Sequence, residues 1–234
     1  MKRFYTNVSI GFPKHGLYSV LLDGKPIKTP KRAELVMPWR GLADAIAEEW
    51  KGQGEKLDPD GMFLTKCANS AIDYTAQHET AVVEGIVAYA NDLLCYRAAE
   101  PADLVALENE VWDPLLAWFE ERYGVKLRTG ATVAPIRQEE EVLARLRAAL
   151  AGLGPFALTA LHGAATLCGS LVLALALFEG RLTAGEAFAA SRLHEDYQAE
   201  KWGRDAYAET RARYLLAELT AAARVLALTK DSSP

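Results

Sequence analysis

The sequence is short of the residues that build metal sites and disulfide frameworks. Its 234 residues include three cysteines and four histidines, and both sets are scattered along the chain. A zinc site needs closely spaced ligand pairs, and a disulfide framework needs an even set of cysteines. We therefore expect no metal, and we expect Cys67, Cys95 and Cys168 to be buried thiols in a reducing compartment.

Motifs for nucleotide binding and nucleophilic catalysis are missing as well. The sequence has no glycine-rich loop followed by Lys-Ser or Lys-Thr, and Gly169-Ser170 lacks the flanking residues of a nucleophile elbow. A zinc-protease helix starting at His194 would need a second histidine where Gln198 stands. We therefore expect neither a cofactor nor catalysis, and we interpret His162 as a hydrogen-bonded core histidine. A small-molecule enzyme with a pocket near His162 or His194 stays open as the alternative.

The chain also lacks an excess of positive charge and an evident leader. Its net charge is −5 and it has no basic stripe, so nothing would replace the counterions of a nucleic acid. We expect no nucleic-acid partner. The residues Met1–Tyr5 pass directly into strand-like sequence, which favours a bacterial cytoplasmic protein or one whose leader has been removed.

One long uncharged segment, Pro155–Phe178, could in principle cross a bilayer. Its small and polar residues, however, fall at helical spacing on one face: Thr159, His162, Gly163, Thr166, Gly169 and Ser170. Aromatic and basic flanks, which anchor membrane spans, are missing. The pattern favours a buried central helix without membrane insertion, and a membrane-associated scaffold is the alternative.

What the sequence does contain predicts an α+β fold. Short strands are expected at Arg3–Ile10, Leu17–Leu22 and Glu34–Met37, with a tight turn at Asp23-Gly24. Helices are expected where apolar residues have helical spacing: Arg40–Gly52, Thr65–Ala76, Glu79–Arg97, Leu104–Tyr123, Glu139–Leu150, Pro155–Phe178, Ala184–Trp202 and Asp205–Leu228. We expect a small β-rich N-terminal domain (1–76) and a larger multihelical C-terminal domain (77–234), with a boundary near residue 100 as the alternative.

Polar residues at the helix ends have structural interpretations. Asp103 and Thr183 are expected to cap helix N-termini, and Gly203 is expected to end a helix in the left-handed conformation. A solvated helix face is expected for three acidic residues, Glu108, Glu110 and Asp113.

Helix Ala184–Trp202 carries residue types that are common in protein recognition. Arginine and aromatic side chains often anchor interfaces, and here they accompany a carboxylate and an amide. The candidate partner-binding residues are Glu195, Arg192, Tyr197, Gln198 and Trp202. The alternative for Glu195 is an intramolecular ion pair on a surface helix.

Several motifs together resemble one protein family. In chain order they are Arg3-Phe4-Tyr5, Leu22-Asp23-Gly24, Lys28-Thr29-Pro30, Glu49-Trp50, Asp92, Tyr96-Arg97, Trp112-Asp113-Pro114-Leu115, Trp118 and Ser191–Gly203. Their order and spacing are similar to those of the assembly chaperones of the ATP synthase catalytic sector, which bind the newly made α subunit in mitochondria and α-proteobacteria. The likeness covers nearly the whole chain. Two positions depart from the family pattern: Glu108 stands in place of glutamine, and His194 in place of an acidic residue.

The resemblance implies a chaperone that is not an enzyme. It would bind the free α subunit of the F-type ATP synthase and shield the surface that later contacts the β subunit. Glu195 is the position matched to a functionally important acidic residue of the family's C-terminal motif. We expect a monomer in the bacterial cytoplasm, with eukaryotic relatives in the mitochondrial matrix.

Overall fold

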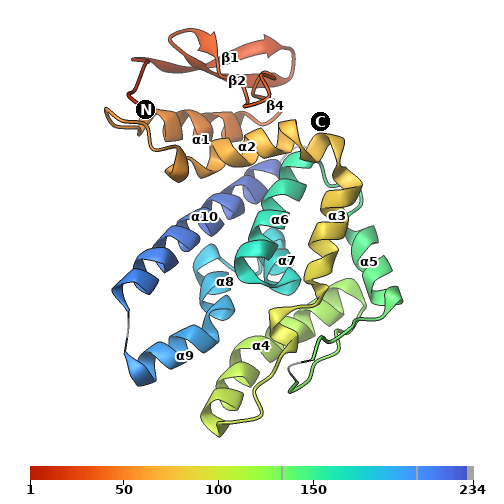
Figure 1. Ribbon diagram of the computed structural model, residues 1–234. Helices are drawn as coiled ribbons and strands as arrows, with labels where there is room; N and C mark the ends of the chain where they lie inside the picture. Colours follow the sequence, from red (N-terminus) through yellow and green to blue (C-terminus); the bar gives the residue numbers. More distant parts are fainter. Residues whose placement is uncertain (133, 204, 231–234) are drawn as a thin grey trace. The chain divides into compact units, whose positions relative to one another are not determined.

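The computed structural model describes residues 1–132, 134–203 and 205–230 (Figure 1). A small antiparallel sheet comes first and a series of helices follows it, so the predicted α+β class is confirmed. The chain divides into two compact units. Unit 1 contains Met1–Glu79, Gly154–Ala160 and the chain from Arg224 onward, and unit 2 contains Thr80–Leu153 and Leu161–Ala223. The domain boundary expected after residue 76 stays a prediction.

The sheet of unit 1 is built around one hairpin. β1 (Val8–Lys14) pairs antiparallel with β2 (Leu17–Leu22). β3 (Lys25–Pro26) and β4 (Val36–Met37) also pair antiparallel with β2. Asp23 and Gly24 have φ values of 48° and 79°, so the predicted tight turn is confirmed.

The chain before β1 is held by other contacts, so the strand expected from Arg3 is shorter than predicted. The Arg3 N–H donates to the Glu55 carbonyl at 2.8 Å. The Asp23 carboxylate accepts from the backbone N–H groups of Thr6 at 3.1 Å and Asn7 at 2.7 Å. Because these groups bond outside the ladder, regular pairing begins only with β1.

Two helices follow the sheet and complete the core of unit 1. α1 (Arg40–Lys51) packs on β1 and β2, and Leu42 and Ile46 on its inner face are fully buried, as their spacing predicts. The Glu49 carboxylate at the end of α1 accepts the N–H groups at the start of α2. The bounds of the remaining helices here are η1 Pro59–Gly61, α2 Phe63–Asp73 and η2 Thr75–Gln77.

Unit 2 is mainly helical. The helix predicted over Glu79–Arg97 ends early, because α3 (Glu79–Val87) passes into short 3₁₀ turns. α4 (Ala102–Tyr123) runs past Pro114 without ending. The remaining helices are η3 Ala88–Ala90, η4 Leu93–Cys95, α5 Glu140–Leu150, α6 Pro155–Cys168, α7 Leu171–Glu179, α8 Ala184–Ser191, α9 Leu193–Trp202 and α10 Ala206–Lys230. Helices α6 and α10 each contribute residues to both units.

The long apolar segment is two helices and not the single helix that the sequence predicted. Gly169, with φ 61°, separates α6 from α7. The Ser170 hydroxyl then accepts the Leu173 N–H at 3.0 Å and caps the N-terminus of α7. No helix among the described residues is long and apolar enough to cross a membrane.

The break before α7 is stabilised by Asp92, a fully buried carboxylate. Its two oxygens accept the backbone N–H groups of Leu94 at 2.9 Å and Val172 at 2.8 Å. Burial raises the pKa of Asp92 to about 6, against the opposing effect of these hydrogen bonds. Asp92 therefore joins the segment after α3 to the start of α7.

The helix predicted over Ala184–Trp202 is also divided, at Arg192 between α8 and α9. The Ala190 carbonyl accepts the indole N–H of Trp112 at 2.9 Å. In an uninterrupted helix that carbonyl would accept the N–H of the residue four positions later. The side chain of Trp112 thus takes the acceptor that a continuous helix would use.

The predicted helix ends and cysteines have mixed outcomes. Thr183 caps α8 through a capping box with Glu186, as predicted for Thr183. The prediction for Asp103 is wrong, because Pro101 is the N-cap of α4. Gly203 ends α9 with φ 96° and ψ 160°, outside the left-handed helical region that was expected. Cysteines 95 and 168 are buried as expected, whereas cysteine 67 is partly accessible.

Candidate partner-binding face of helices α8 to α10

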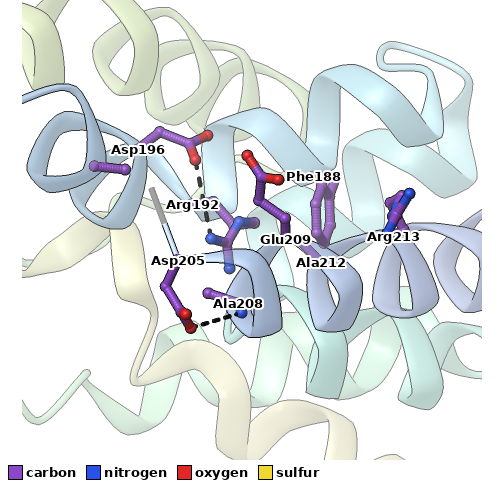
Figure 2. Close-up of a pocket in the computed structure, with 9 residues that line it drawn as sticks. Phe188, Arg192, Asp196, Asp205, Ala208, Glu209, Ala212 and Arg213 are labelled. Carbon is purple, nitrogen blue, oxygen red and sulfur yellow. Dashed lines mark hydrogen bonds and ion pairs between the residues drawn. The ribbon is translucent and has the colours of Figure 1, made fainter. Parts of the chain in front are cut away.

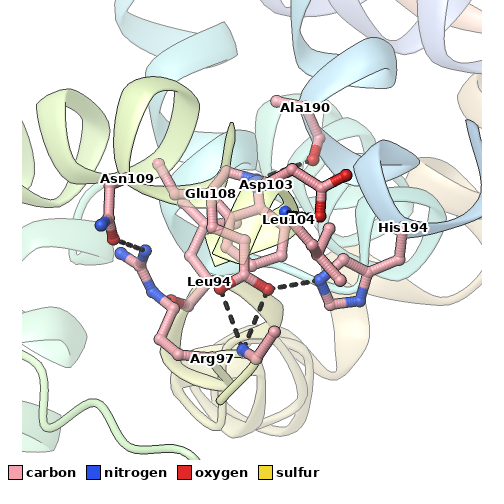
Figure 3. A network of polar contacts seen from close by, with 10 residues as sticks. Leu94, Arg97, Asp103, Leu104, Glu108, Asn109, Ala190 and His194 are labelled. Carbon is pink, nitrogen blue, oxygen red and sulfur yellow. Dashed lines mark hydrogen bonds and ion pairs between the residues drawn. The ribbon is translucent and has the colours of Figure 1, made fainter. Parts of the chain in front are cut away.

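The candidate face begins with a buried carboxylate beneath α9. The side chain of Glu108 on α4 is fully buried, and its oxygens accept the Ala98 N–H at 3.1 and 3.0 Å (Figure 3). The same carboxylate lies 2.5 Å from Nε2 of His194, in the first turn of α9. The prediction of a solvated acidic face is therefore wrong for Glu108, because its partners come from distant parts of the chain.

The other two acidic residues of that predicted face differ from Glu108. Glu110 and Asp113 are exposed, as expected. The Asp113 carboxylate, however, forms an ion pair with Arg97 at 2.5 Å. Arg97 also donates to the Leu94 carbonyl at 2.9 Å, so this pair helps to fasten the segment before α4.

A second polar contact joins α9 to the start of α4. The Tyr197 hydroxyl donates to the Asp103 carboxylate at 2.8 Å, and Lys201 Nζ donates to the same carboxylate at 2.7 Å. Lys201 also contacts the Tyr197 hydroxyl. The hydrogen bonds from Lys201 and then Tyr197 lower the pKa of Asp103 to about 2. Tyr197 thus lies on the side of α9 that faces α4, and its hydroxyl is occupied within the chain.

Arg192 lies at the junction of α8 and α9 and lines two hollows in unit 2. Its guanidinium is 3.9 Å from the Asp196 carboxylate and 5.6 Å from the centre of the Phe188 ring. The first hollow, called here the Arg192 hollow, has a volume of about 320 Å³ (Figure 2). Its lining residues come from α8, α9 and the start of α10: Phe188, Arg192, Asp196, Ala199, Asp205, Ala208, Glu209, Ala212 and Arg213.

The start of α10 on this side is fixed by its own cap. The Asp205 carboxylate accepts the Ala208 N–H at 3.0 Å. The alanine side chains of α9 and α10 leave space between the two helices, and charged groups surround that space (Figure 2). Such a polar rim around a small apolar floor suits contact with another protein.

The second hollow, called here the Glu195 hollow, has a volume of about 430 Å³. It shares Phe188 and Arg192 with the first hollow, and the exposed Glu195 is one of its lining residues. Its lining residues are Leu93, Trp112, Thr166, Leu167, Cys168, Gly169, Phe188, Ser191, Arg192, His194, Glu195 and Leu215. Two of the five predicted partner-binding residues, Arg192 and Glu195, therefore lie together here.

The other exposed candidates follow Glu195 along α9. Glu195, Gln198 and Trp202 are spaced at three and four residues, which places them on one face of the helix. None of the three side chains makes a hydrogen bond or ion pair with another described residue. The intramolecular ion pair considered for Glu195 is therefore absent from the part of the chain that the structure describes. Trp202 is 76% exposed, which is unusual for so large an aromatic side chain.

Sequence reasoning missed an exposed aromatic residue near this face and a contact that shapes it. Tyr207, at the start of α10, is as exposed as Trp202. Trp112 fixes the end of α8 through its indole N–H, yet its motif was noted only for its resemblance to a family. Tyr207 stands beside a predicted helix start, which is a local signal in the sequence. The contact of Trp112 with Ala190 joins distant segments, so no local pattern predicts it.

The geometry does not favour the alternative of an enzyme. His162 packs beside Gly85 and Tyr89, and its ring makes no hydrogen bond to a described residue, contrary to our prediction. Burial lowers the pKa of His162. In the Glu195 hollow, burial raises the pKa of the Cys168 thiol to about 12, and the Ser191 hydroxyl donates to the Phe188 carbonyl at 2.7 Å. Neither group is arranged as an activated nucleophile beside His194.

A metal site is not evident either. Among the described residues, no group of three or more His, Cys, Asp or Glu side chains could hold a metal ion. The contact between His194 and Glu108 is a pair without a third ligand, and the second histidine of a zinc helix is replaced by Gln198.

Comparison with known proteins identifies the family. The model of the ATP12 chaperone protein family matches residues 2–120. The chain belongs to the ATP12 chaperone family. This membership confirms the resemblance on which the prediction of an ATP synthase assembly chaperone rests. Since the matched residues end in α4, the likeness of the candidate face depends on comparisons over the full chain.

Relatives of the ATP12 family extend the match well beyond α4. The mitochondrial protein atp12 of Schizosaccharomyces pombe is 24% identical over 215 residues, covering 86% of this chain and 74% of its own. The crystal structure of Atp12 from Paracoccus denitrificans is 44% identical, with a TM-score of 0.89 over 97% of this chain and 98% of that chain. A crystal structure from Agrobacterium tumefaciens is 41% identical, with a TM-score of 0.93 over 97% of this chain and 86% of that chain.

Proposed function

We propose that this ATP12-family chaperone binds the free α subunit of the F-type ATP synthase through the face formed by α8, α9 and the start of α10. The observation that carries the proposal is the exposed stripe of Glu195, Gln198 and Trp202, which has no partner among the described residues. An unassembled subunit exposes a large apolar surface that is prone to aggregate. A chaperone that covers this surface until the β subunit arrives would prevent such aggregation.

The two sides of α9 fit such a role. One side is held to α4 by His194, Tyr197 and Lys201, which keeps the helix in place without a partner. The other side presents a carboxylate, an amide and an indole to solvent. A surface that is already ordered loses little conformational freedom on binding, and a polar rim allows release when a better partner arrives. We infer that the protein acts as a monomer in the bacterial cytoplasm and without catalysis.

The first test is capture of separately produced α and β subunits from the same organism by the purified chaperone. We expect selective capture of free α, and loss of capture once α is paired with β. Capture of neither subunit, or equal capture of both, would contradict the proposal. Measuring the molecular mass of the free chaperone in solution tests the inference that it is a monomer.

Charge reversal at Glu195 tests the site itself. We expect Glu195→Lys to weaken binding of the α subunit by about tenfold or more, because a partner group that meets a carboxylate would now meet a like charge. Glu200→Lys is the matched control, since Glu200 is another exposed acid of the same helix and lies outside both hollows. Circular dichroism and thermal unfolding should be unchanged in both variants. Wild-type affinity in Glu195→Lys would remove Glu195 from the site.

A further inference from the structure

We propose that the Glu195 hollow is a socket for one cationic side chain of the protein that the chaperone holds, an arginine or a lysine. The aliphatic stem would lie on the apolar wall and the charged head would meet the Glu195 carboxylate. This inference rests on the proposed function, because it names the part of the partner that enters the same face.

The wall of the hollow suits the stem of a long side chain. It is built from apolar groups on four segments of unit 2, including Leu93, Trp112, Leu167 and Leu215. Arginine and lysine bury their methylene groups along such surfaces while the charged head stays at the edge. The volume of about 430 Å³ is in the range of small-molecule sites and leaves room for one long side chain.

The charges at the edge favour a cation. Among the described lining residues, Glu195 is the one acid, and it makes no hydrogen bond or ion pair with a described residue. The two basic side chains at the hollow are directed to other groups. Arg192 lies near Asp196 and over the Phe188 ring, and His194 contacts the buried Glu108 carboxylate.

The position of the hollow favours a side chain of a bound protein over a free small molecule. Glu195 is the first residue of the stripe that continues through Gln198 to Trp202. A segment lying along that stripe would bring its side chains to the edge of the hollow. Because Glu195 is exposed, an ion pair with it contributes mainly when the cation is held in a fixed geometry, and the apolar wall would hold the stem of the side chain.

The socket can be tested with the full chain and with simple probes. We would titrate the protein with Nα-acetyl-arginine amide and Nα-acetyl-lysine amide, and follow the indole N–H of Trp112 and the amide of Gly169 by NMR. Nα-acetyl-norleucine amide, which has an apolar side chain of similar length, is the matched control probe. We expect saturable shifts with the two cationic probes, and about tenfold weaker binding in Glu195→Gln. Glu200→Gln should bind as the wild type does.

Three outcomes would overturn the socket: equal shifts with the norleucine probe, no saturable shift with either cationic probe, or wild-type affinity in Glu195→Gln. A second variant, Leu215→Trp, narrows the hollow without changing its charge. It should also weaken the cationic probes, provided that its thermal unfolding matches that of the wild type; a folded variant with full affinity would contradict the proposed wall.

Binding of the α subunit separates this inference from the proposed function. If the socket is used, raising the salt concentration should weaken α-subunit binding less in Glu195→Gln than in the wild type, because one ion pair is already missing. Binding of α with the same salt dependence in both proteins would overturn the socket and leave the function standing. Failure of wild-type protein to bind α would overturn the function, while the probe titration would still decide whether the hollow takes a cation.

Discussion

Helix α7 is held in unit 2 by apolar burial, whereas helix α9 is held mainly by hydrogen bonds to α4. Every residue from Leu171 to Leu177 is buried, and α7 packs against α4 and α8. In α9 only Leu193 is buried among the described residues. Three polar side chains of α9, His194, Tyr197 and Lys201, bond to carboxylates of α4.

The difference between the two helices matches what each must do. Apolar burial gives large stability but leaves no side chain for a partner. Polar contacts on one side of a helix give less stability, yet they fix its orientation and leave the opposite side exposed. Helix α9 can thus present Glu195 and Trp202 in a defined position, while α7 stabilises unit 2 through its buried side chains.

The largest expected effect comes from the apolar helix. Leu173 on α7 is fully buried, and Leu173→Ala should lower the free energy of unfolding by about 2–5 kcal/mol, because it removes buried methyl groups and leaves a cavity. Gln198→Ala on α9 is the matched control and should change stability by less than about 0.5 kcal/mol. Urea unfolding measures both. Similar losses in the two variants would mean that the exposed side of α9 also supports the fold.

A smaller loss is expected from the buried carboxylate that holds α9. Glu108→Ala should lower the free energy of unfolding by about 1–3 kcal/mol, because it leaves the partly buried Ala98 N–H without its acceptor. Glu108→Gln keeps one acceptor oxygen and should recover most of this loss. A double-mutant cycle with His194→Ala measures the coupling between the two side chains. Coupling near zero would show that their contact does not hold α9.

Local patterns in the sequence predicted the elements better than their interruptions. Leu42 and Ile46 have the spacing of one helix face, and they are buried together on α1 because that spacing is a property of the helix alone. The break before α7 could not be predicted in this way. It depends on Asp92, whose partner Val172 is 80 positions away, and no local spacing records such a pairing.

The candidate site shows the same limit. Residue types in the segment 191–203 indicated recognition, and its motifs indicated the family. Glu108 and His194 were noted only as two separate departures from the family pattern, yet they are partners across 86 positions. Such contacts determine which side of α9 faces α4. The sequence alone therefore could not show that Tyr197 faces α4 and that Glu195 faces solvent.

The smallest expected effect sharpens the distinction between the two sides of α9. Tyr197→Phe removes the hydroxyl that donates to Asp103, and it should lower stability at neutral pH only slightly, because the bond is exposed to solvent. The folded-state pKa of Asp103 is lowered from 3.8 to about 2, so its contribution is present above pH 3.8 and is lost as the pH falls through about 2. The difference between Tyr197→Phe and wild type should therefore shrink in acid, as measured by urea unfolding at several pH values. Tyr207→Phe, on the exposed start of α10, should show no difference at any pH. A pH-independent loss in Tyr197→Phe would mean that the ring, and not its bond to Asp103, fastens α9 to α4.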